Sequence, residues 1–220
     1  MDEQILARYN SDEGAKDYLH KFERHWTERV NNWHEQRLIR RFLRNVSPID
    51  RNGLALDLPC GYGRLYSIVR ELGLSVVEAD WSFPLLAAAR NIHLRRYGTQ
   101  PSQNYLRATA LALPFSARAF EFVLSARLSH HIREHDQRLQ HLRELLRVSR
   151  RWAMFTYFDA ASVKNQTHEF GRRFHQKRAK WTLTFDEVSA IGHSEGFELI
   201  QSAWISRFFS GHRYVLMRRS

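Results

Sequence analysis

Residues 54–65, Leu-Ala-Leu-Asp-Leu-Pro-Cys-Gly-Tyr-Gly-Arg-Leu, decide the fold of this chain. The stretch begins with a short apolar run of strand length, turns through two glycines and passes into the helical pattern of residues 65–73. Glycines in such a turn let the backbone approach a ligand closely, and the helix that follows presents free N–H groups to it. The stretch therefore predicts a strand, a turn that binds a nucleotide-like cofactor, and a helix.

Strand and helix continue to alternate on the C-terminal side of this unit. Further strands are predicted over residues 75–80, 105–108, 121–126 and 152–158, and further helices over residues 84–98 and 134–149. This order predicts a parallel sheet covered by helices.

The two ends of the chain add different elements. In residues 1–50, Tyr18, Phe22, Trp26, Val30 and Trp33 recur at steps of three and four, which predicts a helical cover. Residues 184–196 predict a helix capped by Thr184, and residues 197–205 and 212–219 predict an antiparallel hairpin. We therefore expect an α/β fold: a Rossmann-like, seven-stranded, mostly parallel sheet with a C-terminal antiparallel hairpin, helices on both faces and an N-terminal helical cover.

Composition predicts one domain. The chain has 220 residues, of which 43% are hydrophobic and 26% charged, and no linker rich in Pro, Gly or Ser divides it. Within residues 1–220 we expect a helical lid (1–50), a cofactor-binding core (51–158), a basic insertion on the acceptor side (159–183) and a C-terminal helix and hairpin (184–220). An acidic start without an apolar run, and a single cysteine, Cys60, favour the reducing cytoplasm.

Positive charge is concentrated in the predicted insertion. The formal net charge is +11, and residues 164–180 carry one acid, Glu169, against the basic residues Lys164, Arg172, Arg173, Lys177, Arg178 and Lys180. Such a field favours an anionic partner, although a solvated surface explains a charge run equally well.

A second pattern strengthens the cofactor prediction. Glu78-Ala79-Asp80 ends the second predicted strand, seventeen residues after Gly63. A carboxylate at this place can accept both hydroxyls of a ribose.

At this point the chain resembles the class I S-adenosylmethionine-dependent methyltransferases, in the group with a methyltransferase type 11 or type 25 domain. The resemblance rests on LDLPCGYGRL (56–65), VVEADWS (76–82), ALALPFSARAFEFVLSARLSHHI (110–132) and LRELLRVSRRWAMFTYF (142–158), in the family's order and spacing. It implies S-adenosylmethionine as the cofactor and methyl transfer as the reaction.

The resemblance also implies roles for single residues. Asp57, Gly61 and Gly63 would cradle the methionine and sugar portions of the cofactor, Asp80 would hold the ribose, and Trp81 would flank the adenine. Thr109 stands where the family commonly has an aspartate that contacts the adenine amino group. Tyr9 and Tyr18 resemble an aromatic pair that closes over the cofactor. The remaining residues expected at the cofactor are Pro59, Cys60, Arg64, Ala110 and Leu111.

The acceptor side is predicted from what methyl transfer needs. A hydroxyl or ammonium acceptor must lose a proton, and His130 and His131, just past the fourth predicted strand, are candidate general bases. Arg127, Arg172 and Arg173 are candidate binding residues for an anionic acceptor. We expect an acidic protein that presents a lysine, or a small phosphorylated, sugar or lipid metabolite, ahead of RNA. The nearest cluster of possible metal ligands is His130 and His131 with His135 and Asp136; it lacks a third ligand at a convincing position, so no metal is expected.

Two other functions remain open from the residues alone. A non-catalytic protein that binds the cofactor and docks a partner is the main alternative, supported by Thr109. A nicotinamide-dependent oxidoreductase is disfavoured, because no third glycine follows Gly63 and Arg64 occupies the start of the helix.

Overall fold

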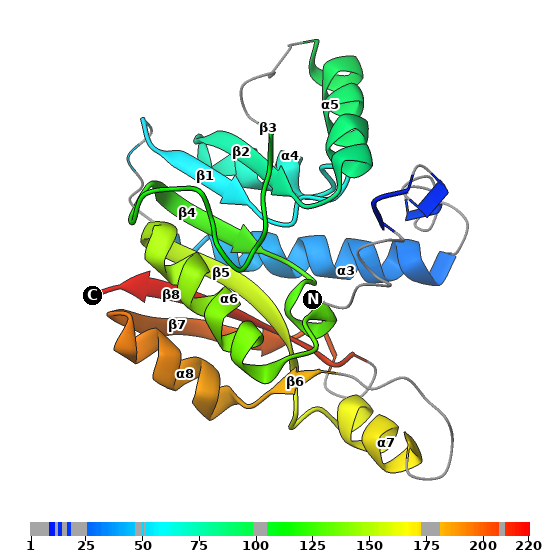
Figure 1. Cartoon of the computed structure of the whole chain (residues 1–220), viewed down its shortest axis with the longest axis vertical. Coiled ribbons are helices and arrows are strands. Elements are labelled where there is room, and N and C mark those ends of the chain that lie inside the picture. Colours follow the sequence, from blue (N-terminus) through cyan, green and yellow to red (C-terminus); the bar gives the residue numbers. More distant parts are fainter. Residues whose placement is uncertain are drawn as a thin grey trace.

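The computed structural model describes residues 9–11, 13–14, 17–18, 26–46, 50, 52–98, 105–172, 181–206 and 210–220. Within these ranges the chain forms one eight-stranded sheet with the order β3-β2-β1-β4-β5-β8-β7, and β6 pairs with β5 outside this path (Figure 1). The strands are β1 (Leu54–Asp57), β2 (Ser75–Asp80), β3 (Tyr105–Arg107), β4 (Phe120–Ser125), β5 (Ser149–Asp159), β6 (Thr182–Leu183), β7 (Phe197–Trp204) and β8 (His212–Arg219).

Strand direction follows the prediction. Strands β1 to β6 pair in parallel, whereas β8 runs antiparallel to both β5 and β7. The predicted fold class is therefore confirmed, including the C-terminal hairpin. The structure adds β6, because a two-residue strand is too short to leave an alternating pattern in the sequence.

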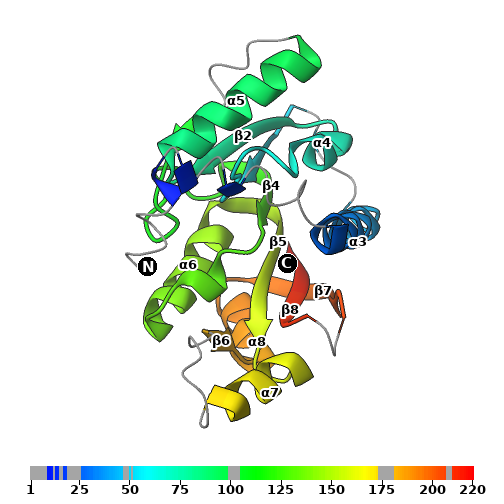
Figure 2. The same ribbon diagram turned by 90° about the vertical axis from the view of Figure 1, so that its right-hand side faces the viewer.

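Helices cover both faces of the sheet. They are α3 (Trp26–Leu43), α4 (Tyr66–Val69), α5 (Phe83–Tyr97), α6 (His135–Val148), α7 (Val163–Arg172) and α8 (Phe185–Ser194), with the short 3-10 helices η1 (Arg70–Leu72) and η2 (Ser129–His131). One apolar core lies between the sheet and α3 and α4, and another between the sheet and α6 and α8. Figure 2 shows α3 and α4 on the opposite side of the strands from α6.

Local signals in the sequence explain where the helices start. The hydroxyl of Ser82 accepts a hydrogen bond from the backbone N–H of Leu85 (3.2 Å) and so caps α5, which ends at Gly98 with a φ of 65°. Thr184 and Glu187 form a reciprocal capping box at the start of α8, as the predicted cap requires.

Helix α3 buries a different side from the one its apolar stripe suggests. Trp26, Val30 and Trp33 are 74%, 42% and 55% exposed. Ile39 and Phe42, on the other side of the helix, are fully buried. The stripe predicts the helix but is not its buried face. Phe22, which belongs to the same stripe, lies outside the described residues.

The parallel strands place four polar residues at one edge of the sheet. Asp57, Asp80, Ser125 and Asp159 end β1, β2, β4 and β5. In open α/β sheets, ligands bind outside these carboxyl ends. Across the described part of the chain, every helix is too short or too polar to cross a membrane.

Candidate functional site

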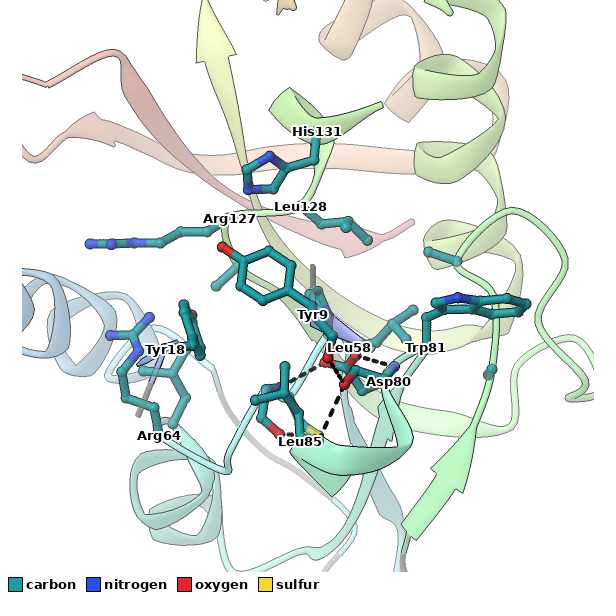
Figure 3. A pocket seen from close by; sticks show the side chains of 18 of the residues that line it. Tyr9, Tyr18, Leu58, Arg64, Asp80, Trp81, Leu85, Arg127, Leu128 and His131 are labelled. Carbon is teal, nitrogen blue, oxygen red and sulfur yellow. Dashed lines mark hydrogen bonds between the residues drawn. The ribbon is translucent and has the colours of Figure 1, made fainter. Parts of the chain in front are cut away.

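A cavity of about 260 Å³ lies at the carboxyl ends of β1, β2 and β4. Its wall comes from the turn after β1, the end of β2, the segments after β3 and β4, the start of β8, and Tyr9 and Tyr18. In Figure 3, Asp80 and Trp81 lie on one side of the cavity, and Arg127 and His131 lie on the other. The residues that the sequence predicts at the site and that the structure places in this wall are Tyr18, Pro59, Cys60, Gly61, Arg64, Asp80, Trp81, Ala110, Arg127, His130 and His131.

The turn after β1 needs both of its glycines. Gly61 and Gly63 have φ values of 59° and 78°, in the left-handed region that favours glycine. A Cβ atom on Gly63 would also lie 2.3 Å from Nε2 of His93. The turn is fastened to β2, because the backbone N–H of Cys60 donates to the carbonyl of Ala79 (2.9 Å). Gly63 therefore shapes the turn from beneath the wall, not within it.

A buried polar cluster supports this turn. Nδ1 of His93 lies 3.0 Å from Oε2 of Glu78 and 2.6 Å from the hydroxyl of Tyr105, and its ring stacks on Tyr66 at 4.0 Å. Burial raises the pKa of Glu78, and the hydrogen bond and charge of His93 oppose that shift. The sequence motifs contain Glu78 but give no sign of His93, which comes from α5.

Asp80 is held in place by backbone groups. Its Oδ2 accepts from the N–H of Gly61 (2.9 Å) and its Oδ1 from the N–H of Ser82 (2.8 Å). Burial raises the pKa of Asp80 to about 6, although these backbone hydrogen bonds act in the opposite direction. Each carboxylate oxygen has a further lone pair, so the group can also accept the hydroxyls of a ribose.

Asp57 lies beneath the wall and lacks a donor. It is 1% exposed, and neither carboxylate oxygen has a hydrogen-bond partner among the described residues. Burial, and the neighbouring carboxylate of Glu78, raise the pKa of Asp57 well above its usual range. A buried carboxylate without a partner is unfavourable. Because Asp57 does not line the cavity, its expected role in cradling the cofactor stays a prediction.

The segment after β3 contributes small residues to the wall. Ala108 and Ala110 line the cavity. The hydroxyl of Thr109 accepts a hydrogen bond from the backbone N–H of Leu111 (3.3 Å), and both residues stand behind the described wall. Trp81 is 39% exposed, with the guanidinium of Arg107 4.7 Å from its ring centroid. Trp81 therefore has the accessible ring that its expected role beside the adenine requires.

The opposite side of the cavity is organised by a glutamate that the motifs miss. Glu35 of α3 is fully buried. Its Oε2 accepts from Arg64 (2.7 Å) and Arg127 (2.8 Å). Its Oε1 accepts from Nε of Arg127 (2.9 Å) and from the hydroxyl of Tyr214. Four segments distant in the sequence therefore meet at one carboxylate.

The charges around Glu35 decide its ionisation. Burial alone would raise the pKa, but Arg64, Arg127 and the hydroxyl of Tyr214 outweigh it and lower the pKa of Glu35 to about 2. Two guanidiniums share this one carboxylate, so the group of three carries a net positive charge. Glu35 is followed at +4 and +7 by the buried Ile39 and Phe42, so the three residues share one face of the helix. An acid on this inward face was the sequence signal that could have revealed Glu35.

Three histidines border the cavity next to Arg127. His130 lies 4.0 Å from His131 and 4.8 Å from His212, measured between ring centroids. His130 also stacks on Phe158 at 4.2 Å. Burial lowers the pKa of His212 to about 3, so its imidazole is neutral. His212 starts β8, where no motif points to it. Among the described residues, no three or more His, Cys, Asp or Glu side chains, these histidines included, are arranged to hold a metal ion.

The N-terminal tyrosines lie at the cavity as expected. The rings of Tyr9 and Tyr18 meet edge to face at 5.3 Å, and Tyr18 meets Tyr62 in the same way at 5.7 Å. Burial raises the pKa of Tyr18 to about 12, so its hydroxyl is protonated. The hydroxyl of Ser82 donates to the carbonyl of Tyr9, which fastens this segment to the start of α5.

The predicted acceptor insertion is only partly described. It contains α7, which Asn165 fixes by donating from its Nδ2 to the carbonyls of Asp159 (2.8 Å) and Gly211 (3.2 Å). Arg172 is the last residue of α7, and Arg173 lies outside the described residues. Their expected role in binding the acceptor stays a prediction.

Comparisons with known proteins agree with this geometry. A family model described as a methyltransferase domain matches residues 56–155, from β1 into β5. A protein of Encephalitozoon cuniculi, provisionally named a methyltransferase, is 26% identical over 190 residues, which cover 84% of this chain and 78% of that protein.

Solved structures share the fold at low sequence identity. Magnesium protoporphyrin IX methyltransferase from Synechocystis, crystallised with bound SAH, has a TM-score of 0.82, 14% identity and 100% coverage of both chains. A second match is a chain from the Haloferax volcanii complex between the Trm112 methyltransferase activator and a protein provisionally named a methyltransferase. It has a TM-score of 0.66 and 14% identity, and the match covers 94% of this chain and 96% of that chain.

Proposed function

We propose that this chain, a class I S-adenosylmethionine-dependent methyltransferase, transfers the methyl group to an acceptor that carries an anionic group close to the reacting atom. The observation that carries the proposal is the distribution of charge around the cavity. Arg64 and Arg127 lie in the wall on the side away from Asp80. Asp80 is the one carboxylate side chain among the described wall residues.

Both guanidiniums share one carboxylate, Glu35. It pairs with both guanidiniums from behind the wall, so one negative charge faces two positive charges. In a buried site an unbalanced charge attracts a counter-ion strongly. The anionic group of an acceptor would supply that counter-ion, which favours a phosphorylated or carboxylated metabolite or an acidic protein segment over a neutral molecule.

The reacting group is placed by the same wall. The cofactor supplies an activated methyl group on a sulfonium, so the lone pair of the acceptor attacks the methyl carbon as the bond to sulfur breaks. Gly61 and Asp80 would orient the cofactor from one side, and Arg127 the acceptor from the other; positioning of this kind supplies much of the rate. Where the acceptor is a hydroxyl or ammonium group, His130 or His131 would take its proton.

The proposal is tested with pairs of acceptors that differ in one anionic group. Each pair consists of a phosphorylated or carboxylated compound and its neutral counterpart, and an acidic lysine peptide is paired with its amidated form. Transfer of labelled methyl from S-adenosylmethionine is measured for both members. We expect a higher kcat/KM for the charged member of each pair. Arg127→Gln should lower the ratio of kcat/KM between the charged and the neutral member about tenfold, as expected for a lost charged contact.

Arg133→Gln is the matched control, because Arg133 follows η2 but its side chain is 70% exposed. It should leave the ratio unchanged. Equal transfer to charged and neutral members would contradict the proposal. Failure of every acceptor, in a folded protein that binds S-adenosylhomocysteine, would favour the non-catalytic alternative.

A further inference from the structure

Helix α3 has a second side that faces away from the sheet and takes no part in the cavity. At about 100° per residue, Trp26, Val30, Trp33 and Arg37 point into an arc about 60° wide. The first three are 74%, 42% and 55% exposed. Figure 2 shows α3 end-on at the periphery of the molecule. These side chains form a continuous surface, called here the outer ridge of α3.

The outer ridge is strongly basic at its C-terminal end. The exposed arginines on this side of the helix, and in the turn after it, are Arg29, Arg37, Arg40, Arg41 and Arg44. Arg40 pairs with Glu71 (2.8 Å); the other four have no ion-pair partner among the residues that the structure describes. Glu28 is half-buried and Glu35 is buried, so the ridge carries no compensating acid of its own helix.

Apolar and basic side chains are separated along the ridge. The two tryptophans and Val30 occupy the first turns of α3, and four of the five arginines lie from Arg37 onward. In Figure 1 the N-terminal part of α3 runs past the carboxyl ends of β1 and β4, so its apolar end projects from the body of the protein. The ridge is about 27 Å long at 1.5 Å per residue.

We propose that the outer ridge of α3 binds an anionic membrane surface. Indole side chains favour the boundary between water and lipid, and arginines are attracted to anionic headgroups. A helix that combines both lies in the plane of the interface. Binding of single-stranded nucleic acid fits less well, since it needs open aromatic faces for stacking. The ring of Trp33 is already engaged by Arg37 (5.4 Å) and His34 (4.8 Å), and Val30 cannot stack.

Exposed aromatic side chains also occur near the carboxyl edge of the sheet. Trp81 and Phe83, at the end of β2 and the start of α5, are 39% and 67% exposed. Phe170 of α7 is 63% exposed. All three follow the carboxyl ends of strands, the edge past which the apolar end of α3 projects and which faces the viewer in Figure 2. This inference does not depend on the proposed acceptor.

The test is co-sedimentation of the full chain with phosphatidylcholine vesicles and with vesicles that contain about one third phosphatidylglycerol, an anionic lipid. We expect binding to the anionic vesicles alone, weakened by salt. The double variants Trp26→Ala/Trp33→Ala and Arg41→Glu/Arg44→Glu should each lower the partition coefficient about tenfold or more, because each removes two interfacial contacts.

Matched controls separate the ridge from general stickiness and net charge. Arg90→Glu/Arg143→Glu changes the net charge by the same amount at exposed sites on α5 and α6. Leu94→Ala/Leu199→Ala removes two other exposed apolar side chains, which are 36% and 37% exposed. Both should bind as the unaltered chain does. The proposal is overturned if the unaltered chain stays in the supernatant, if the controls lose as much binding as the ridge variants, or if a single-stranded RNA of mixed sequence binds more tightly through the same ridge residues.

Discussion

Two buried carboxylates stand at opposite sides of the cavity, and their surroundings have opposite effects. Glu35 faces two guanidiniums and a tyrosine hydroxyl, and its pKa is lowered to about 2. Asp80 faces only backbone N–H groups, and burial raises its pKa to about 6. Burial is similar, since Glu35 is 0% and Asp80 6% exposed. The nature of the partner, full charges or dipoles, therefore decides which state each group prefers.

The difference separates a structural carboxylate from one that still has capacity for a ligand. Glu35 accepts from three side chains that hold α3 to the sheet. Asp80 keeps lone pairs free at the cavity and is only partly stabilised as an anion. We therefore expect substitution of Glu35 to affect folding first, and substitution of Asp80 to affect cofactor binding first.

Glu35→Gln is the largest expected change. Removing the negative charge takes away the carboxylate that Arg64 and Arg127 share, which should lower the free energy of unfolding by about 3 to 5 kcal/mol. Denaturant unfolding followed by circular dichroism measures it. Glu71→Gln on the partner of Arg40 is the matched control: this ion pair is 43% and 48% exposed, so its loss should cost about 0.5 kcal/mol or less.

The pH dependence of stability sharpens this prediction. The pKa of Glu35 lies below its unfolded value, so its stabilising contribution is complete above about pH 4.5 and is lost as the pH falls towards about 2. The Glu35→Gln variant should lack this loss. If the stability of the variant fell with pH as steeply as that of the unaltered chain between these pH values, Glu35 would not be the group responsible.

Asp80→Ala should act mainly on the cofactor. If the ribose hydroxyls donate to this carboxylate, its removal costs about 1.5 to 3 kcal/mol, or about 10- to 150-fold in Kd for S-adenosylhomocysteine. Isothermal titration calorimetry measures the change. Asp136→Ala, at a fully exposed carboxylate, is the control and should bind normally; equal affinity for Asp80→Ala would remove Asp80 from the cofactor site.

The raised pKa of Asp80 gives the opposite pH window from Glu35. Its folded pKa of about 6 lies above the unfolded value of 3.8. Its contribution to stability is therefore complete below about pH 4 and is lost as the pH rises through about 6. Hydroxyl donors favour the ionised form, so cofactor affinity should increase between about pH 5 and pH 7. A pH-independent affinity in Asp80→Asn would assign this increase to Asp80.

The same contrast explains what the sequence could predict. Two adjacent strand-and-turn units contain Asp57, Gly61, Gly63 and Asp80. Residues close together in the sequence are therefore also close together in the fold on this side of the cavity. The seven strands of the main path were predicted from local patterns too: five from the alternation of strand, turn and helix, and the last two from a hairpin.

The other side of the cavity could not be predicted in this way. Glu35 meets Arg64, Arg127 and Tyr214 across separations of 29, 92 and 179 residues. His212 reaches His130 only because β8 is inserted between β5 and β7. Contacts of this kind depend on strand order, which single-sequence patterns do not contain, so Arg127 was predicted without the partner that fixes it.

Tyr214→Phe is the smallest change and tests whether Glu35 acts as the centre of one network. It removes a single hydroxyl, and Oε1 of Glu35 keeps its hydrogen bond from Nε of Arg127 (2.9 Å). We therefore expect a loss of about 1.5 kcal/mol of unfolding free energy, the low end for one hydrogen bond to a charged group. In the Glu35→Gln background the same substitution should cost much less, because the charge that strengthens the bond is gone. Additive losses in this double-mutant cycle would mean that Tyr214 stabilises β8 by packing alone, and that α3 is held to the sheet by the two arginines without it.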